Sequence, residues 1–218
     1  QKRRLDDNRG YAWNELVALF SHEEFQQLRY AEGRPGNAVF WIPLIAAYTG
    51  ARREELAQLY VADVHQHGDG SWFIRVIDDQ PDKSVKTDSS RREIPVHNDL
   101  IALGLLTLIE GRPSGSRVFP QLLKVSDGFA GIVSKSWRPI TQRCGVYREG
   151  RHPLHAFRHT FKTLAREHGI PKEVSDWITG HASGHVGDGY GINPLSRMGS
   201  EIQKLPSIAR AAGLLPAI

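Results

Sequence analysis

The stretch HPLHAFRHTFKTLAREHG, residues 152–169, predicts one strong helix. Pro153 near its start and Gly169 at its end are residue types that begin and end helices. His155 and Arg158 are three residues apart, and this spacing places both on one face of the helix. A group that exchanges protons near neutral pH and a permanent cation therefore lie side by side on this helix.

Helices are also predicted on both sides of this stretch. AVFWIPLIAAYTG (38–50) is apolar nearly all round, so we expect a buried helix that Asn37 caps and Gly50 ends. A short helix follows from Arg53 to Leu59. Further helices are expected after a capping box at Ser21 and Glu24, over 98–110, 127–143 and 171–180, and once or twice within 194–213.

The pattern changes between these helices. VADV (61–64), SWFIRVI (71–77) and RREIPV (91–96) are typical of strands, with the turn signal HGDG between the first two. The loop DDQPDKSVKTDSS (78–90) joins the last two. The predicted fold class is therefore mainly α with a small three-stranded antiparallel β-sheet (α+β).

The length and composition of the chain exclude several classes of protein. A chain of 218 residues with 40% hydrophobic residues is long enough for one domain with a real core. No apolar run has the length of a membrane helix, no secretory signal opens the sequence, and glycine loops for nucleotides are absent. Cys144 is the one cysteine, which excludes an internal disulfide and fits a reducing cytosol. We interpret it as a packing or surface residue.

The formal net charge is +4 and the isoelectric point is about 9.3, which is only mildly basic. The distribution of charge is more informative, because acidic pairs such as Glu23-Glu24 and Asp78-Asp79 lie apart from the main basic groups. The cations that fall in or beside four short motifs are Arg52, Arg53, Lys83, Lys86, Arg91, Arg92, Arg151, Arg158, Lys162 and Arg166. The alternative is a solvated surface with scattered salt bridges.

The four motifs are TGARREEL (49–56), KTDSSRREIPV (86–96), HAFRHTF (155–161) and GHASGHVGDGYG (180–191). Arginine presents a rigid fork that grips two phosphate oxygens at once, and a lysine on a hairpin can protonate a departing oxygen. Tyr190 lies nine residues after His181 in a polar, glycine-rich stretch without apolar partners. Such a set can bind a phosphodiester, protonate a leaving oxygen and attack phosphorus without a metal.

In this order, the four motifs resemble the catalytic domain of tyrosine recombinases, the phage-type integrases, from about Asn37 to Tyr190. The resemblance implies that fold, no cofactor and no metal. It implies that two arginines clamp the phosphate, that one histidine donates to a phosphate oxygen and another exchanges a proton with the tyrosine, that lysine is the general acid, and that tyrosine is the nucleophile. These positions are Arg52 and Arg158, His181, His155, Lys86 and Tyr190 respectively.

Alternatives remain at several positions. Lys83 competes with Lys86 for the role of the acid. The pairs His155/His159 and His181/His185 have the spacing of zinc ligands, although no cysteine cluster or HExxH pattern accompanies them. Arg53 and His159 are interpreted as surface and packing residues, and Glu55 as a residue that orients its neighbours.

Two features depart from the family. The segment SGHVGDGY replaces the usual polar SSxxTTxxY, which leaves the positioning of Tyr190 open. No N-terminal DNA-binding domain fits before Asn37, and the first residue is Gln, so we expect a catalytic fragment. Its expected division is 1–36 as lead-in and first helix, 37–190 as catalytic core and 191–218 as a helical tail.

The resemblance predicts site-specific recombination of a phage or mobile element, by cleavage and rejoining of double-stranded DNA through a 3′-phosphotyrosyl intermediate. The expected partners are DNA and further copies, as a tetramer on DNA. Alone, the chain is expected to be a monomer in the cytoplasm, at the bacterial nucleoid, and to bind DNA weakly and salt-dependently. The alternatives are relaxation of DNA by a type IB topoisomerase, and a DNA-binding module that has lost catalysis.

Overall fold

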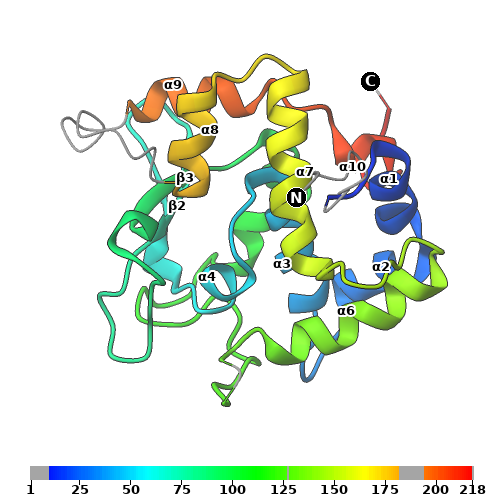
Figure 1. Cartoon of the computed structure of the whole chain (residues 1–218). Coiled ribbons are helices and arrows are strands. Elements are labelled where there is room, and N and C mark those ends of the chain that lie inside the picture. Colours follow the sequence, from blue (N-terminus) through cyan, green and yellow to red (C-terminus); the bar gives the residue numbers. More distant parts are fainter. Residues whose placement is uncertain (1–9, 127, 182–193, 218) are drawn as a thin grey trace, which may run out of the picture.

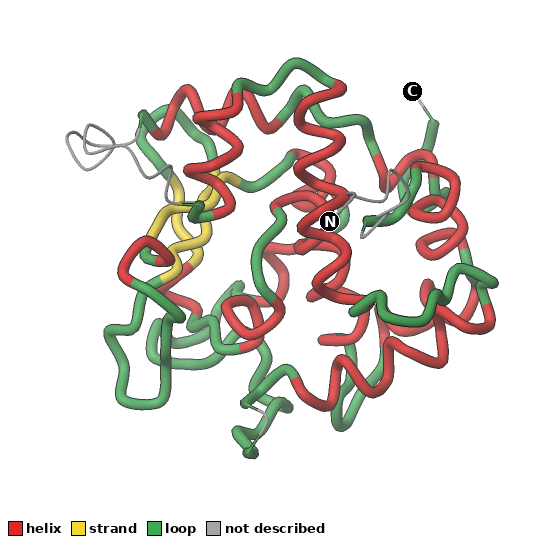
Figure 2. The backbone as a smooth tube through the Cα atoms, in the orientation of Figure 1, coloured by secondary structure: helices red, strands yellow, loops and turns green. Residues whose placement is uncertain are grey.

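Residues 10–126, 128–181 and 194–217 are described by the computed structural model of the chain. Helices make up most of the regular structure, and the strands gather in one small region (Figure 2). In chain order the elements are α1 (Trp13–Ser21), α2 (Glu23–Gln27), α3 (Ala38–Thr49), α4 (Arg53–Ala57), β1 (Val64–Gln66), β2 (Trp72–Val76), β3 (Arg92–Pro95), α5 (Asn98–Ala102), α6 (Gly131–Arg143), α7 (Pro153–Glu167), α8 (Lys172–Thr179), α9 (Leu195–Ile202) and α10 (Ile208–Ala211). Short 3-10 helices lie at Leu28–Tyr30, Val61–Asp63, Asp88–Ser90 and Leu105–Leu108. The predicted fold class is confirmed.

The centre of the molecule is α3, in which every residue is buried. This confirms the interpretation of its uniformly apolar sequence. The long helix α7 packs along α3, and α6 packs against both (Figure 1). Aromatic rings from five helices fill the space between them: Phe20, Phe25, Phe40, Trp137 and Phe157. These contacts, through Phe40 on α3 and Phe157 on α7, hold together the two helices that position the candidate site.

The sheet lies beside α8 and α9, with the strand order β1-β2-β3 and antiparallel pairing throughout. His65 pairs with Phe73, and Ile74 pairs with both Val64 and Ile94. The strand predicted at 61–64 is wrong in its bounds, because residues 61–63 form a 3-10 turn and the strand begins at Val64. The backbone N–H groups of residues 61 and 62 donate to the carbonyls of residues 116 and 114, so they are not available to the sheet.

The predicted capping box at Ser21 is also wrong. Ser21 is the last residue of α1, and its hydroxyl donates to the carbonyl of Val17 at 2.7 Å. The next helix begins after His22, whose side chain makes no capping bond. Asn37 does precede α3 as predicted, but its side-chain oxygen accepts from Gln121 instead of capping the helix.

Two helices differ from the predicted lengths. The segment 98–110 divides at Gly104, which has a φ of 90°, into α5 and a 3-10 helix. α6 begins at Gly131 instead of 127. The carboxylate of Glu54 accepts from the N–H groups of Phe129 and Ala130 at 2.7 and 2.9 Å, so a side chain from α4 holds the residues just before this helix.

The C-terminal helices fold back onto the described domain. α9 packs against β3 and α8, and α10 packs against α1 (Figure 1). Met198, Ile202 and Ile208 are fully buried by these contacts. Within the described ranges, no helix combines the length and the apolar character that a membrane span requires.

Candidate active site

The candidate site begins at the end of α3. Gly50 closes the helix with a left-handed φ of 64°, and its N–H donates to the carbonyl of Ala46 at 2.8 Å. A side chain at position 50 would lie 2.9 Å from both Phe161 and Thr179, so α7 and α8 pack directly on this turn. The chain is extended at Arg52, which stands immediately before α4.

Arg52 is held by Glu55, one turn further on. The backbone N–H of Arg52 donates to one carboxylate oxygen of Glu55 at 2.8 Å, and its guanidinium donates to the other at 2.7 Å. The same guanidinium nitrogen lies 3.3 Å from the hydroxyl of Ser90. The side chain keeps 27% of its surface exposed, so part of its fork faces solvent while the rest is fixed. Arg53 points elsewhere and donates to Ser134 on α6.

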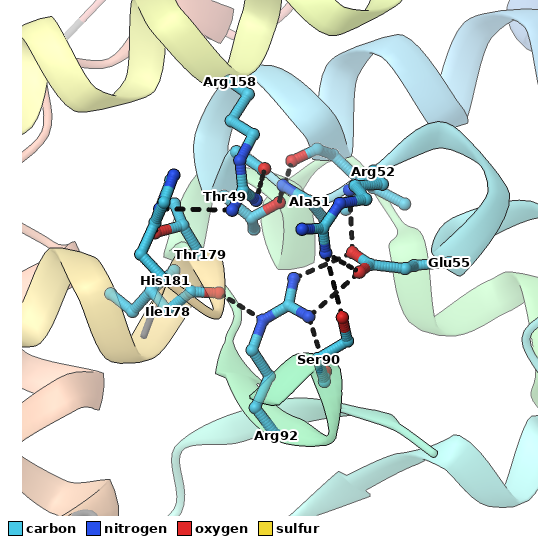
Figure 3. A network of polar contacts seen from close by, with 12 residues as sticks. Thr49, Ala51, Arg52, Glu55, Ser90, Arg92, Arg158, Ile178, Thr179 and His181 are labelled. Atoms are coloured by element: carbon cyan, nitrogen blue, oxygen red, sulfur yellow. Dashed lines mark hydrogen bonds and ion pairs between the residues drawn. The ribbon is translucent and has the colours of Figure 1, made fainter. Parts of the chain in front are cut away.

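Arg158 reaches the same turn from α7. Its guanidinium donates to the carbonyl of Gly50 at 2.9 Å, and a second nitrogen lies 3.2 Å from Nδ1 of His181. Burial, followed by the positive charges of Arg52 and Arg92, lowers the pKa of Arg158 to about 10. Figure 3 shows Arg52 and Arg158 on two sides of the turn that runs from Thr49 to Ala51. Cations this close favour an anion between them.

His181 follows α8, which ends at Gly180 in a left-handed conformation. Its Nδ1 lies 2.8 Å from the hydroxyl of Thr179 as well as near Arg158. Partial burial, with the charges of Arg158 and Lys162, lowers the pKa of His181 to about 4, so the ring is neutral at physiological pH. A guanidinium only donates, so the Arg158 contact is a hydrogen bond when Nδ1 accepts, which leaves the proton on Nε2. His181 is then a neutral donor.

His155 lies one turn before Arg158 on α7 and is exposed. Its ring meets the edge of His159 with the centroids 5.3 Å apart. Loss of water around its ring, followed by the influence of His159, Arg158 and Arg52, lowers the pKa of His155, so it is a free base at neutral pH. His155 lines a pocket of about 560 Å³ together with Arg52 and residues of α6.

The structure separates the two candidate lysines. Lys83 is buried, and its ammonium lies 2.9 Å from both carboxylate oxygens of Asp63 and 2.9 Å from Asp79. Lys86 is exposed in the loop before β3, and no hydrogen bond joins it to another described residue. The loop leads from Lys86 to Ser90, whose hydroxyl contacts Arg52.

Arg92 is a residue of the site that sequence reasoning missed. It lies on β3, its side chain is only 2% exposed, and it binds both oxygens of Glu55 at 2.8 and 3.1 Å. The signal is present in the strand pattern, because alternation places Arg92 on the same inward face as the buried Ile94. A cation at an inward position requires a buried acidic partner, and Glu55 is that partner.

Four of the six predicted site residues thus come together from three segments: Arg52, Arg158, His155 and His181. Lys86 is exposed in the loop that leads to Ser90, and Tyr190 lies outside the described residues, as does His185. Among the residues that are described, no three histidine, cysteine, aspartate or glutamate side chains converge to hold a metal ion.

Comparison with solved structures decides what fold this is. An integrase from a mycobacterium phage, Brujita, matches with a TM-score of 0.59 at 16% identity, over 94% of this chain and 60% of that chain. The site-specific recombinase XerH, bound to its difH substrate before cleavage, matches with a TM-score of 0.56 at 19% identity, over 80% of this chain and 47% of that one. The chain has the fold of a tyrosine recombinase catalytic domain.

A third structure, the XerA recombinase, matches with a TM-score of 0.52 at 18% identity over 96% of this chain. This chain covers between 47% and 64% of the length of these recombinases and integrases. No model of a known protein family matches the sequence. No curated protein matches it either.

Proposed function

We propose that this recombinase-fold chain cleaves and rejoins double-stranded DNA through a 3′-phosphotyrosyl intermediate, in site-specific recombination of a phage or mobile element. The observation that carries the proposal is the convergence of Arg52, Arg158 and His181 around one turn. The two guanidinium groups and the neutral imidazole can donate hydrogen bonds to an anion, and the nearby carboxylate of Glu55 is already bonded to Arg52 and Arg92. That is an environment for a phosphate and for the charge that builds on it.

In the proposed first step, Tyr190 attacks the scissile phosphorus. A phenol has a pKa of about 10, so it needs a base, and His155 takes the proton as the Oη–P bond forms. Arg52 and Arg158 hold the two non-bridging oxygens, and Nε2–H of His181 donates to one of them.

The bond from phosphorus to the 5′ oxygen breaks in the same step. Lys86 gives its proton to that oxygen, so the products are a phosphotyrosyl 3′ end and a free 5′ hydroxyl. A 5′ hydroxyl from a partner strand reverses the sequence and rejoins DNA. The energy of the phosphodiester is kept in the covalent link, so the proposal requires no nucleotide and no metal.

Exchange between two duplexes requires several copies, so the proposal includes a tetramer on DNA, at the bacterial nucleoid. One of the solved recombinases of the same fold, XerH, is bound to its difH substrate, which supports DNA as the partner by analogy of fold. The buried ion pair of Lys83 supports Lys86 as the acid, because a lysine held by two carboxylates is not free to reach a substrate.

The test uses nicked duplexes that lose a short 5′ fragment after cleavage, so the covalent complex accumulates. We expect a stable protein–DNA adduct in excess chelator, and peptide mapping should place it on Tyr190. Tyr190→Phe should abolish the adduct but keep DNA affinity, whereas Tyr30→Phe, a change at a 77% exposed tyrosine, should leave it unchanged.

The outcomes separate the alternatives. DNA binding without any adduct indicates a module that has lost catalysis. An adduct with relaxation of supercoiled DNA, but without exchange between duplexes, indicates a topoisomerase. A linkage to another tyrosine removes Tyr190 from the proposal, and dependence on added zinc or magnesium removes the metal-free mechanism.

A further inference from the structure

Arg92 is a buried cation, and its partners must offset the free energy lost when its charge is removed from water. Its side chain is 2% exposed, and a charge removed from water is tolerated only where it is paired and hydrogen-bonded. Four separate acceptor contacts surround it: two oxygens of Glu55, the carbonyl of Ser90 at 2.7 Å and the carbonyl of Ile178 at 2.7 Å. These acceptors belong to α4, the turn before β3 and α8.

Glu55 has no capacity left once these bonds are made. One of its oxygens accepts from the guanidinium groups of Arg52 and Arg92, and the other accepts from the Arg52 backbone and from Arg92. Its buried carboxylate is pulled toward ionisation: burial raises its pKa, but the bonds and charges of Arg92 and Arg52 outweigh this and lower the pKa overall. These bonds fix the orientation of the Glu55 carboxylate, and the carboxylate in turn fixes the position of the Arg52 guanidinium.

Arg92 also contacts α8, on the side of the site away from Glu55. Its Nε donates to Ile178 in the last turn of α8, and Gly180 passes so close that an added Cβ would lie 3.1 Å from the Arg92 side chain. His181 follows directly. Figure 3 shows Arg92 below the turn, with bonds running to the Glu55 side and to the Ile178 side.

We propose that Arg92 is a positioning residue, which fixes Arg52 through Glu55 and the start of the His181 segment through Ile178, so that both donors face one phosphate. This inference rests on the proposed function. A lysine at this position keeps the charge but cannot form the two-pronged contact with Glu55 or reach Ile178 at the same time. Arg92→Lys should therefore displace the Arg52 guanidinium while leaving the net charge of the site unchanged.

The first experiment compares Arg92→Lys with Arg91→Lys. Arg91 is the adjacent residue, 47% exposed and paired with Asp78 and Asp88, so it is a matched control outside the site. In single-turnover cleavage of the nicked duplex at saturating protein, Arg92→Lys should be about 100-fold slower, the scale of a displaced catalytic group. The Kd for DNA and the rate of Arg91→Lys should stay close to those of the wild type.

A substrate with a neutral methylphosphonate at the scissile position identifies the route of the effect. It lacks the charged oxygen that Arg52 is proposed to hold, so the defect of Arg52→Lys should shrink on it. The defect of Arg92→Lys should shrink in parallel. A defect of Arg92→Lys that stays constant while that of Arg52→Lys shrinks overturns the proposal, as does a cleavage rate equal to the wild type.

A crystal structure of Arg92→Lys provides a readout that does not depend on activity. The Arg52 guanidinium should leave its place beside Glu55 and Ser90, and an unmoved Arg52 overturns the proposal whatever the wild type does to DNA. A wild-type chain that forms no adduct rejects the proposed function alone, and this structure still decides the role of Arg92. If Arg92→Lys shows no cooperative thermal transition, Arg92→Gln takes its place in all three measurements.

Discussion

Lys86 and Lys83 lie three residues apart, but their surroundings give them different chemistry. Lys86 is exposed in the loop before β3, whereas the ammonium of Lys83 bridges two carboxylates. We predict that Lys86→Ala slows cleavage of ordinary DNA by about 100-fold or more, the usual scale of a lost general acid. The loss should be much smaller when sulfur replaces the bridging 5′ oxygen, because a thiolate leaves without a proton.

The two substrates are compared by single-turnover cleavage under identical conditions. Equal slowing on both would move Lys86 to a binding role. Lys83→Met is the complementary variant, and we expect it to lower the free energy of unfolding by about 3–5 kcal/mol because it leaves Asp63 buried without its partner.

His181 gives a prediction for stability against pH. Its pKa falls from 6.5 to about 4 on folding, mainly through burial and then the charge of Arg158. Between these values the unfolded chain holds a proton that the folded chain lacks, so stability should fall as the pH is lowered through this window. The lowered pKa of His155 acts with the same sign.

Urea unfolding at a pH above 6.5 and at one between 6.5 and 4 measures this slope. His181→Gln should make it shallower, whereas His168→Gln, a change at an exposed histidine at the end of α7, should not. A wild-type slope that His181→Gln leaves intact would show that other groups carry the pH dependence.

Individual site residues can be predicted from the sequence where a motif has a distinctive spacing. Arg52, His155, Arg158 and His181 follow from local patterns, and the structure brings them together. Arg92 escapes such a prediction because its importance comes from Glu55 and Ile178, which are distant in sequence. Local spacing carries no information about such partners unless the inward face of a strand is considered.

At the scale of elements, the turn between α3 and α4 connects the core to the site. Gly50 combines a φ of 64° with close packing, since a Cβ would lie 2.9 Å from Phe161 and Thr179. Gly169 has a similar φ of 69°, but a Cβ there would meet nothing within 4 Å. Substitution of Gly169 therefore tests backbone strain alone, whereas substitution of Gly50 tests backbone strain together with a steric clash.

We predict that Gly169→Ala lowers the free energy of unfolding by about 1–2 kcal/mol, the cost of a left-handed residue with a side chain. Gly50→Ala should cost more than this and should also slow cleavage, because its carbonyl accepts from Arg158. Urea denaturation of both variants tests the difference. Equal losses would mean that α7 and α8 adjust to the added methyl group without cost.

Element boundaries are predicted well where one stretch of sequence determines them and poorly where tertiary contacts do. α3 and α7 match their predicted spans, because apolar periodicity, Pro153 and Gly50 act locally. The strand at 61–64 and the start of α6 are predicted wrongly, since the first is diverted by carbonyls near residue 115 and the second is held by Glu54.

At the scale of the whole molecule, the C-terminal helices complete the hydrophobic core. Tyr48 on α3 donates to Asp99 at 2.5 Å and accepts from the backbone of Ala209 at 2.8 Å. Ser207 donates to the same carboxylate oxygen at 2.5 Å. A polar network thus joins the centre of the domain to its last helix.

This arrangement predicts that the chain is a monomer in the absence of DNA, because its C-terminal helices are packed on its own α1, α8 and β3. Deletion of 194–218 should expose the covered faces of these elements and abolish cooperative unfolding. Tyr48→Phe, a milder change, should leave Ala209 without its acceptor and cost about 1–3 kcal/mol. Sedimentation at moderate salt tests the monomer, and thermal denaturation tests both variants. A stable tetramer without DNA, or a deleted chain that melts like the intact one, would show that the tail serves a partner instead of its own domain.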